Sequence, residues 1–142
     1  MNTARHRHTA TGLSDGSVLV VGGMTASDAP LNTCEIYDPT TGTWSYTGSM
    51  TYARKYHTTS RIADGRIIVI GGQDANNNPM NTAEEYNPST GTWSLIGSLT
   101  EGRYDHGAAV LFTGQIVITG CYGVNGYMNS IKIYNPFTVR ES

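Results

Sequence analysis

Two segments of the chain decide the fold: residues 66–73 (RIIVIGGQ) and residues 84–94 (EEYNPSTGTWS). Both occur 49 residues earlier, at 17–24 (SVLVVGGM) and 35–45 (EIYDPTTGTWS), and nearly half of the positions in the two 49-residue stretches are identical. A more divergent copy of the first segment follows at 115–122 (QIVITGCY). Self-similarity at a fixed period of this length indicates a repeat architecture.

Each copy predicts four short strands. An Asp-Gly pair at residues 15–16 and 64–65 separates the first strand from a continuous apolar second strand, and this pair between apolar runs is a strong hairpin signal because glycine tolerates positive φ. Paired glycines end the second strand, and an Asp-Pro or Asn-Pro pair ends the third, since proline cannot donate to a ladder. The third strand is predicted at residues 33–37, 82–86 and 130–134, and the fourth at residues 43–46 and 92–96.

Four antiparallel strands in a repeated unit of this length are typical of a β-propeller blade. The paired glycines, the Tyr-Asp-Pro or Tyr-Asn-Pro turn and the following tryptophan resemble kelch repeats over essentially the whole chain, most closely at residues 37–49 and 86–98. The resemblance implies an all-β fold of kelch-type β-propeller blades. We expect about three blades, at about residues 1–49, 50–98 and 99–142, the third lacking its fourth strand.

Three blades are fewer than the roughly four to eight that close a propeller. The first and last blades would each leave a broad apolar face uncovered, and such a face marks an interface. Because Met1 aligns with Met50 and Leu99, we expect the chain to begin at a repeat boundary. Three interpretations stay open: a piece of a longer propeller, a homodimer that closes a six-blade ring, and an open three-blade arc.

The composition argues against several classes of protein. The net charge is −2 and lysine is nearly absent, whereas nucleic-acid and anionic membrane surfaces need clustered lysine and arginine. No apolar run approaches the roughly 20 residues of a membrane span, and the polar, basic N-terminus does not have the pattern of a secretory signal. Cys34 and Cys121 have neither the number nor the spacing of a disulfide framework or a zinc site, and the compartment stays open.

Residues kept in every copy are expected to do the same structural work in each blade. The paired glycines should allow a close backbone approach or positive φ. The repeated aromatic side chains should fill the space between blades. These are Tyr37, Tyr86, Tyr134, Trp44 and Trp93.

Other repeated residues leave alternatives open. Glu35 and Glu84, with Lys132 in the third copy, are either paired carboxylates for acid/base chemistry or polar partners of a backbone or arginine group. A histidine recurs at residues 8, 57 and 106; three imidazoles can bind zinc or copper, or each can be hydrogen-bonded within its blade. An arginine recurs at residues 5, 54 and 103 and could read an anionic group or bridge two blades.

Strand direction places the loop between the second and third strands on the same face as the loop between blades. The sequence varies between copies in these loops, and loops on a rigid scaffold commonly carry recognition. Tyrosine, arginine and asparagine suit adaptable contacts. The candidate ligand-binding residues are Arg5, Arg7, Arg54, Tyr56, Asp74, Asn76, Asn77, Arg103, Asp105, Tyr122 and Tyr127.

The kelch resemblance implies a non-enzymatic module that binds a protein, a peptide or a glycan, with no cofactor, metal or catalytic residue and with no nucleic-acid or membrane partner. One alternative is a structural fragment of a larger propeller that has no activity alone. The other is a fragment of a copper enzyme of the galactose oxidase type, whose site uses tyrosine, histidine and a cysteine-modified tyrosine. Neither Cys34 nor Cys121 can be placed beside such a pair from the sequence.

Overall fold

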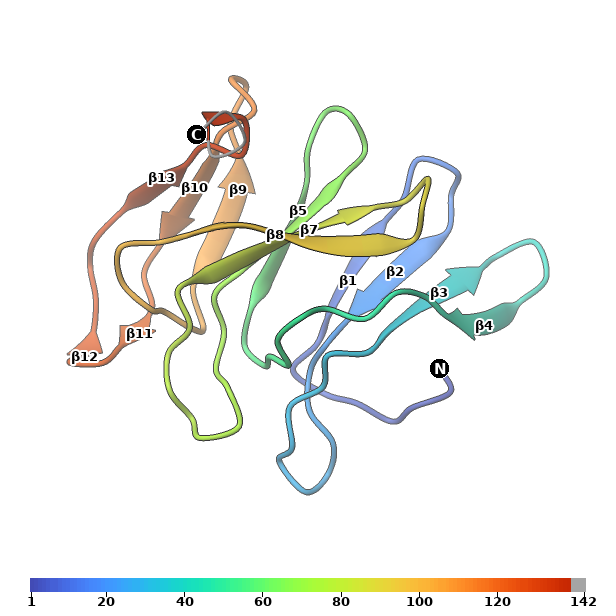
Figure 1. Ribbon diagram of the computed structural model, residues 1–142, viewed down its shortest axis with the longest axis horizontal. Coiled ribbons are helices and arrows are strands. Elements are labelled where there is room, and N and C mark those ends of the chain that lie inside the picture. The colour runs from blue at the N-terminus through green and yellow to red at the C-terminus, as the bar shows by residue number, and fades with distance from the viewer. Residues whose placement is uncertain (139–142) are drawn as a thin grey trace.

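The computed structural model describes residues 1–138 and consists of β-strands joined by turns and loops (Figure 1). Three antiparallel sheets follow one another along the chain, and the first strands of successive sheets contact each other. The expected all-β architecture of four-stranded blades is therefore confirmed. Within the described residues, no helix has the length and apolar character needed to cross a membrane.

Blade 1 is the sheet formed by β1 (Thr9–Gly12), β2 (Val18–Val21), β3 (Cys34–Asp38) and β4 (Thr43–Tyr46). Each strand pairs antiparallel with the next one along the chain, so the blade is a simple meander. β2 is almost wholly buried. Burial on both faces explains why this strand is a continuous apolar run and not an alternating one.

Blade 2 repeats this arrangement with β5 (Thr58–Arg61), β6 (Ile67–Ile70), β7 (Thr82–Asn87) and β8 (Thr92–Ser98). A β-bulge interrupts the pairing of β7 with β8. The fourth strand runs two residues beyond the predicted segment 92–96, because pairing resumes after the bulge. A bulge adds an unpaired residue to one strand and lets the strand bend.

Blade 3 contains β9 (Gly107–Val110), β10 (Ile116–Thr119) and β13 (Lys132–Tyr134), in the order β13-β10-β9. Where a loop is expected between the second and third strands, the chain forms a short hairpin of β11 (Tyr122–Gly123) and β12 (Gly126–Tyr127). The third strand begins later than the predicted residue 130. The segment 139–142, at which a fourth strand was expected to be missing, lies outside the described residues.

The three blades share one strand register. In each, the first residue of the apolar strand pairs with the repeated tyrosine, and these pairs are Val18 with Tyr37, Ile67 with Tyr86 and Ile116 with Tyr134. Equivalent positions of the copies therefore occupy equivalent places in their sheets. The third copy is one residue shorter before its tyrosine. The strand pairing confirms the alignment of its residues 132–134 with the third strand of blade 2.

The hydrophobic core lies between the blades. One cluster joins Leu19 and Val21 of blade 1 to Ile67, Val69 and Tyr86 of blade 2. A second cluster continues from the opposite face of blade 2 into blade 3. Since each sheet buries its apolar side chains against its neighbour, no blade has a complete core of its own.

The repeated aromatic residues join neighbouring blades, as expected. The hydroxyl of Tyr86 shares a hydrogen bond with that of Thr47 in the preceding blade, at 2.7 Å. The indole N–H of Trp93 donates to the carbonyl of Gly48 at 3.0 Å. Tyr134 packs in the core between blades 2 and 3 and donates its hydroxyl to a carbonyl of blade 2.

In blade 1, Tyr37 and Trp44 contact each other with ring centroids 5.1 Å apart. Both are only half-buried, because the described residues place no blade before blade 1. The inter-blade packing expected of these two residues is not present within residues 1–138.

The paired glycines bring neighbouring blades into close contact. A Cβ atom on Gly22 would lie 2.8 Å from the carbonyl oxygen of Arg54, and Gly22 has a φ of +56°. The adjacent Gly23 N–H donates to that same carbonyl at 3.0 Å. The N–H of Gly72 makes the corresponding bond to Arg103 of blade 3, at 2.9 Å. The pair is therefore needed for backbone approach, as predicted from its repetition.

The connections divide into two faces (Figure 1). The turns between the first and second strands lie at one end of the blades, and the loops between β2 and β3 and between β6 and β7 lie at the other, beside the β11–β12 hairpin. We call the second end the loop face. The predicted placement of the variable loops on one face agrees with this arrangement.

Candidate functional site

The repeated arginines of blades 1 and 2 are buried in ion pairs. Arg54 Nη2 lies 2.8 Å from Glu84 Oε1, and its Nη1 donates to the carbonyls of Gly71 and Thr82. Glu84 also accepts the backbone N–H groups of Thr51 at 2.7 Å and of Tyr52 at 3.1 Å. Both charged side chains are fully buried.

Blade 1 has the same network. Arg5 donates to Glu35 at 2.9 Å, and Glu35 accepts the N–H groups of Asn2 and Thr3. Burial raises the pKa of Glu35, but these hydrogen bonds and the guanidinium outweigh it and hold the pKa below its usual range. The glutamates are therefore partners of an arginine and of backbone groups, one of the two alternatives left open by the sequence. A ligand-contacting role of Arg5 and Arg54 stays a prediction, and their burial favours a structural role.

Blade 3 keeps the arginine of this network without its carboxylate. Lys132 occupies the position of Glu84 in the sheet, since Ile118 pairs with Lys132 as Val69 pairs with Glu84. The side chain of Arg103 is fully buried, and its three guanidinium nitrogens have no hydrogen-bond partner within residues 1–138.

The repeated histidines lie at the contacts between first strands. Nε2 of His57 shares a hydrogen bond with the hydroxyl of Thr9 at 3.1 Å, and His106 shares one with Thr58 at 2.8 Å. Burial, and then the neighbouring arginine, lower the pKa of His57 to about 3 and that of His106 to about 4. Both imidazoles are therefore neutral near pH 7. Within the part of the chain that the structure describes, no three metal-ligating side chains gather into a cluster.

The residue two after each repeated arginine has a left-handed backbone. Arg7, Tyr56 and Asp105 have φ values of 56°, 56° and 54°. The N–H of Tyr56 donates to the carbonyl of Arg7 at 3.4 Å, and the N–H of Asp105 donates to the carbonyl of Tyr56 at 2.9 Å. Backbone hydrogen bonds thus link these variable positions from one blade to the next. Their side chains differ while their backbone is held, which is the arrangement of a recognition loop on a scaffold.

A row of aromatic side chains crosses the loop face from these positions. The Arg7 guanidinium lies 5.1 Å from the ring centroid of Tyr56, and Tyr56 lies 6.1 Å from Tyr104. Tyr104 stacks on Tyr122 with centroids 5.4 Å apart, and Tyr122 contacts Tyr127 at 4.2 Å. We call these five residues the tyrosine row.

The exposed end of the tyrosine row is Tyr127, which retains 84% of its accessible surface. A side-chain hydrogen bond with Tyr127 raises the pKa of Tyr122 to about 12, so the Tyr122 hydroxyl stays protonated near neutral pH. The row therefore presents phenol rings and hydroxyl donors beside one guanidinium. Such side chains are enriched in protein–protein contacts.

The predicted candidates in the loop of blade 2 mostly stabilise that loop. Asp74 accepts the N–H groups of Asn76 and Asn78 at 2.8 and 2.9 Å. Asn77, with a φ of 61°, accepts a hydrogen bond from the buried Lys55 ammonium at 2.8 Å. Asp74, Asn76 and Asn77 reach the loop face as part of a self-bonded turn and are not members of the tyrosine row.

Four members of the tyrosine row are among the candidate binding residues predicted from the sequence, and Tyr104 is not. Tyr104 pairs with Tyr122 through an isolated bridge, and this pairing places its ring between Tyr56 and Tyr122. A signal was present: the equivalent residues of the other copies are His6 and Lys55, so the position is as variable as the one that follows it.

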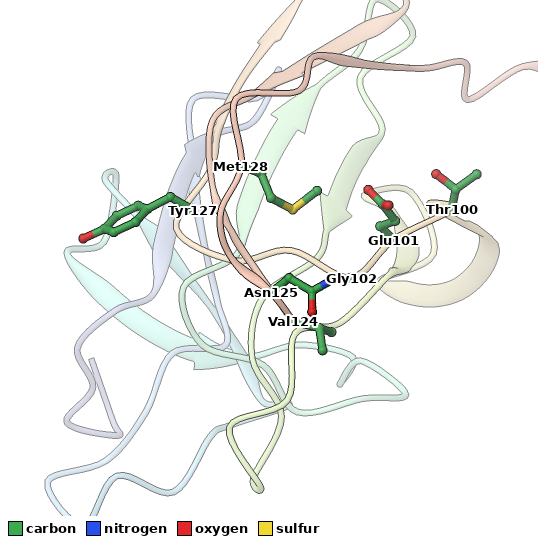
Figure 2. A pocket seen from close by; sticks show the side chains of 7 residues that line it. All are labelled: Thr100, Glu101, Gly102, Val124, Asn125, Tyr127 and Met128. Carbon is green, nitrogen blue, oxygen red and sulfur yellow. The ribbon is translucent and has the colours of Figure 1, made fainter.

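A hollow of about 390 Å³ lies between the segment that enters blade 3 and the β11–β12 hairpin (Figure 2). Thr100, Glu101 and Gly102 form one side, and Asn125 and Met128 are on the other. Figure 2 shows the Met128 side chain extending toward that of Glu101. Tyr127 also lines the hollow, which therefore borders the tyrosine row.

One family model matches residues 1–140, and its description is the KLHDC2/KLHL20/DRC7 Kelch-repeats domain. The match spans nearly the whole chain and includes every residue of the tyrosine row. A comparison with curated protein sequences finds none that matches this chain.

Proposed function

Because the chain belongs to the kelch-repeat family, we propose that it is a non-enzymatic interaction module that holds a protein or peptide on its loop face. Kelch repeats suggest protein interaction as the general function. The finer proposal is that the tyrosine row provides the contact. The candidate residues Arg7, Tyr56, Tyr122 and Tyr127 take part directly, and Tyr104 joins them.

The observation that carries the proposal is the continuity of the tyrosine row across blades 2 and 3. Its rings are held by strand pairing and by the backbone chain between blades, so little conformational entropy is lost when a partner binds. Tyrosine and arginine supply large contact areas and hydrogen-bond donors at binding hot spots. A peptide that lies across the row could use several rings at once.

The proposal is tested by selecting peptides from a displayed random library on the intact chain. Substitution of Tyr127 or Tyr56 by serine should weaken the selected peptides at least about tenfold, as expected for a binding hot spot. The matched control is Phe112→Ser, because Phe112 is fully exposed in the turn between β9 and β10, on the opposite face. Equal loss in all three variants, or in none, would contradict binding through the tyrosine row.

A glycan is a second candidate ligand, since a row of partly exposed rings also offers stacking surfaces for sugars. An oligosaccharide array on wild type and Tyr127→Ser would separate the two ligand classes. Sugar binding that depends on Tyr127, with no peptide selected, would replace the peptide proposal.

A scaffold role is the second candidate function. Blade 3 exposes Val110, Ile131, Ile133 and Phe137, which a further blade would cover. That blade could belong to a longer chain or to a second copy that closes a six-blade ring. Light scattering of the purified chain measures the outcome: twice the monomer mass favours the ring.

A further inference from the structure

Blades 1 and 2 each contain a built carboxylate site. In blade 2, the carboxylate of Glu84 is bound by the Arg54 guanidinium and by the N–H groups of Thr51 and Tyr52, at 2.7 to 3.1 Å. Blade 1 binds Glu35 in the same way. The three donors come from one short segment, so the site is formed by the chain that enters each blade.

Blade 3 has the donors of this site and no carboxylate. The equivalents of Arg54, Thr51 and Tyr52 are Arg103, Thr100 and Glu101. Within residues 1–138, neither the N–H of Thr100 nor that of Glu101 has a hydrogen-bond partner. The third donor group, the guanidinium of Arg103, is fully buried and also lacks one.

A second buried group at this place has lost its partner. In blade 2, the hydroxyl of Thr82 accepts a hydrogen bond from Arg54 Nη2 at 3.2 Å. Ser130 is the equivalent residue of blade 3, and its buried hydroxyl has no partner within the described residues. The third strand of blade 3 begins only at Lys132, so Ser130 is no longer held in the sheet. Buried polar groups are normally paired, and a set of unpaired ones calls for a ligand or another explanation.

Two hollows border the segment that carries the N–H donors, and Arg103 itself lines neither of them. The hollow of about 390 Å³ is lined by Thr100 and Glu101, and a second of about 320 Å³ is lined by Thr100 and Lys132. The Lys132 ammonium adds a positive charge where blades 1 and 2 have a negative one. A carboxylate can therefore approach the N–H of Thr100 from both hollows and that of Glu101 from the larger one, three and two residues before the buried Arg103, whereas a cation is disfavoured.

We propose that blade 3 binds an external carboxylate at Arg103 and at the N–H groups of Thr100 and Glu101, in the place that a glutamate fills in the other blades. The carboxylate belongs to a small acid or to an acidic side chain of a peptide. Bonds between ionised groups are about twice as strong as neutral ones, and arginine is well shaped to hold a carboxylate. This inference goes beyond the tyrosine row, because it assigns a separate site and a ligand chemistry.

Glu101 is a weak internal competitor for the same guanidinium. Its Oε2 lies 3.9 Å from Arg103 Nη2, beyond hydrogen-bond distance, and its side chain is 58% exposed. An ion pair whose carboxylate is exposed and too distant for a hydrogen bond contributes little. Glu101→Gln should therefore bind the external carboxylate more tightly than the wild type does.

The test follows backbone amide resonances of the ¹⁵N-labelled chain during titration with sodium acetate, against sodium chloride at equal ionic strength. We expect the amides of Thr100 and Glu101 to shift and saturate. Those of Thr51 and Tyr52 are the internal control and should stay in place, because Glu84 already occupies their site.

Two peptides identify the source of the carboxylate: acetyl-Gly-Glu-Gly-amide and its glutamine counterpart. Tighter binding of the glutamate peptide than of acetate indicates a peptide side chain, and the reverse indicates a small acid. The glutamine peptide should bind at least about tenfold more weakly than the glutamate peptide, because it lacks the charge.

Lys132→Glu restores the internal carboxylate. This variant should be more stable to heat than wild type and should lose the acetate response, whereas Lys132→Gln should keep it. The proposal is overturned if Thr100 and Glu101 respond to neither probe, or if they respond equally in Lys132→Glu. Tyr127→Ser should leave the acetate response intact. The experiments therefore test the carboxylate site and peptide binding by the tyrosine row independently of each other.

Discussion

Substitution of Glu84 by glutamine tests the energetic role of the buried ion pairs. The side chain keeps its size and loses its charge, so the fully buried guanidinium of Arg54 is left without a counter-ion. One carboxylate oxygen, which accepts the N–H of Thr51 or of Tyr52, is replaced by an amide group that cannot accept. Breaking a buried pair by removing one partner costs about 3–5 kcal/mol. For a domain of this size, that loss corresponds to a fall in melting temperature of roughly 10–15 °C.

Urea denaturation at pH 7, followed by circular dichroism and tryptophan fluorescence, measures this loss. The matched control is Glu101→Gln, which neutralises a carboxylate near the equivalent arginine of blade 3. Because Glu101 is largely exposed and too distant for a hydrogen bond, its loss should stay within about 0.5 kcal/mol. A cost below about 1 kcal/mol for Glu84→Gln, or equal costs for the two variants, would refute the reasoning.

Three further predictions concern single positions. Trp93→Ala should cost about 3 kcal/mol in the free energy of unfolding, because its half-buried ring packs against the core between two blades and its N–H is bonded there. Trp44→Ala should cost less in the same urea titration, because the only ring that the Trp44 ring contacts within the described residues is that of Tyr37 in its own blade. The pKa of His57 is about 3 in the folded chain and near 6.5 unfolded, so the unfolded state binds the proton first. Stability should therefore fall as the pH drops below about 6.5, by roughly 3 kcal/mol at pH 4 from this residue, and His57→Gln should flatten that dependence in melts taken across the pH range. Gly71→Ala should lower the melting temperature strongly, because φ is +63° and the Cβ atom would lie 2.5 Å from a carbonyl oxygen of the next blade, whereas Gly12→Ala, with nothing within 4 Å, should leave it unchanged.

The strands of each blade could be predicted from the sequence, because the signals that begin and end them are short and recur in every copy. The Asp-Gly turns, the apolar second strand and the proline after the repeated tyrosine each depend on only a few neighbouring residues. The pairing of Ile67 with Tyr86 follows once those turns are placed. The bulge that lengthens β8 and the β11–β12 hairpin could not be predicted in this way. Both depend on how long a strand stays paired, and that is set by packing against the neighbouring blade.

The placement of the variable loops on the loop face could be predicted from the sequence, whereas the contacts that join the rings into the tyrosine row could not. Comparison of the copies identified the variable positions, and strand direction placed them on one side. The order of the rings depends on contacts between blades, such as the stacking of Tyr104 on Tyr122 across an isolated bridge. The burial of Arg5 and Arg54 is likewise shown only by the structure, although the repeated glutamates at 35 and 84 already indicated that an arginine could be their partner.

The third copy differs from the other two in the charges around its repeated arginine. Its arginine is kept at position 103, while Lys132 stands at the position of the matching glutamate. The third copy is also one residue shorter before its tyrosine, and Lys132 is the first residue of the shortened third strand. A buried cation whose nearest carboxylate, that of Glu101, is exposed and 3.9 Å away lowers stability, so the exchange opposes the folding of this blade. Departures of this kind from a local rule are expected at functional sites. A bound carboxylate would pair with the Arg103 guanidinium and would restore the stability that the empty site lacks. Because a ligand that binds only the folded chain stabilises it, this gain in stability would be part of the binding free energy.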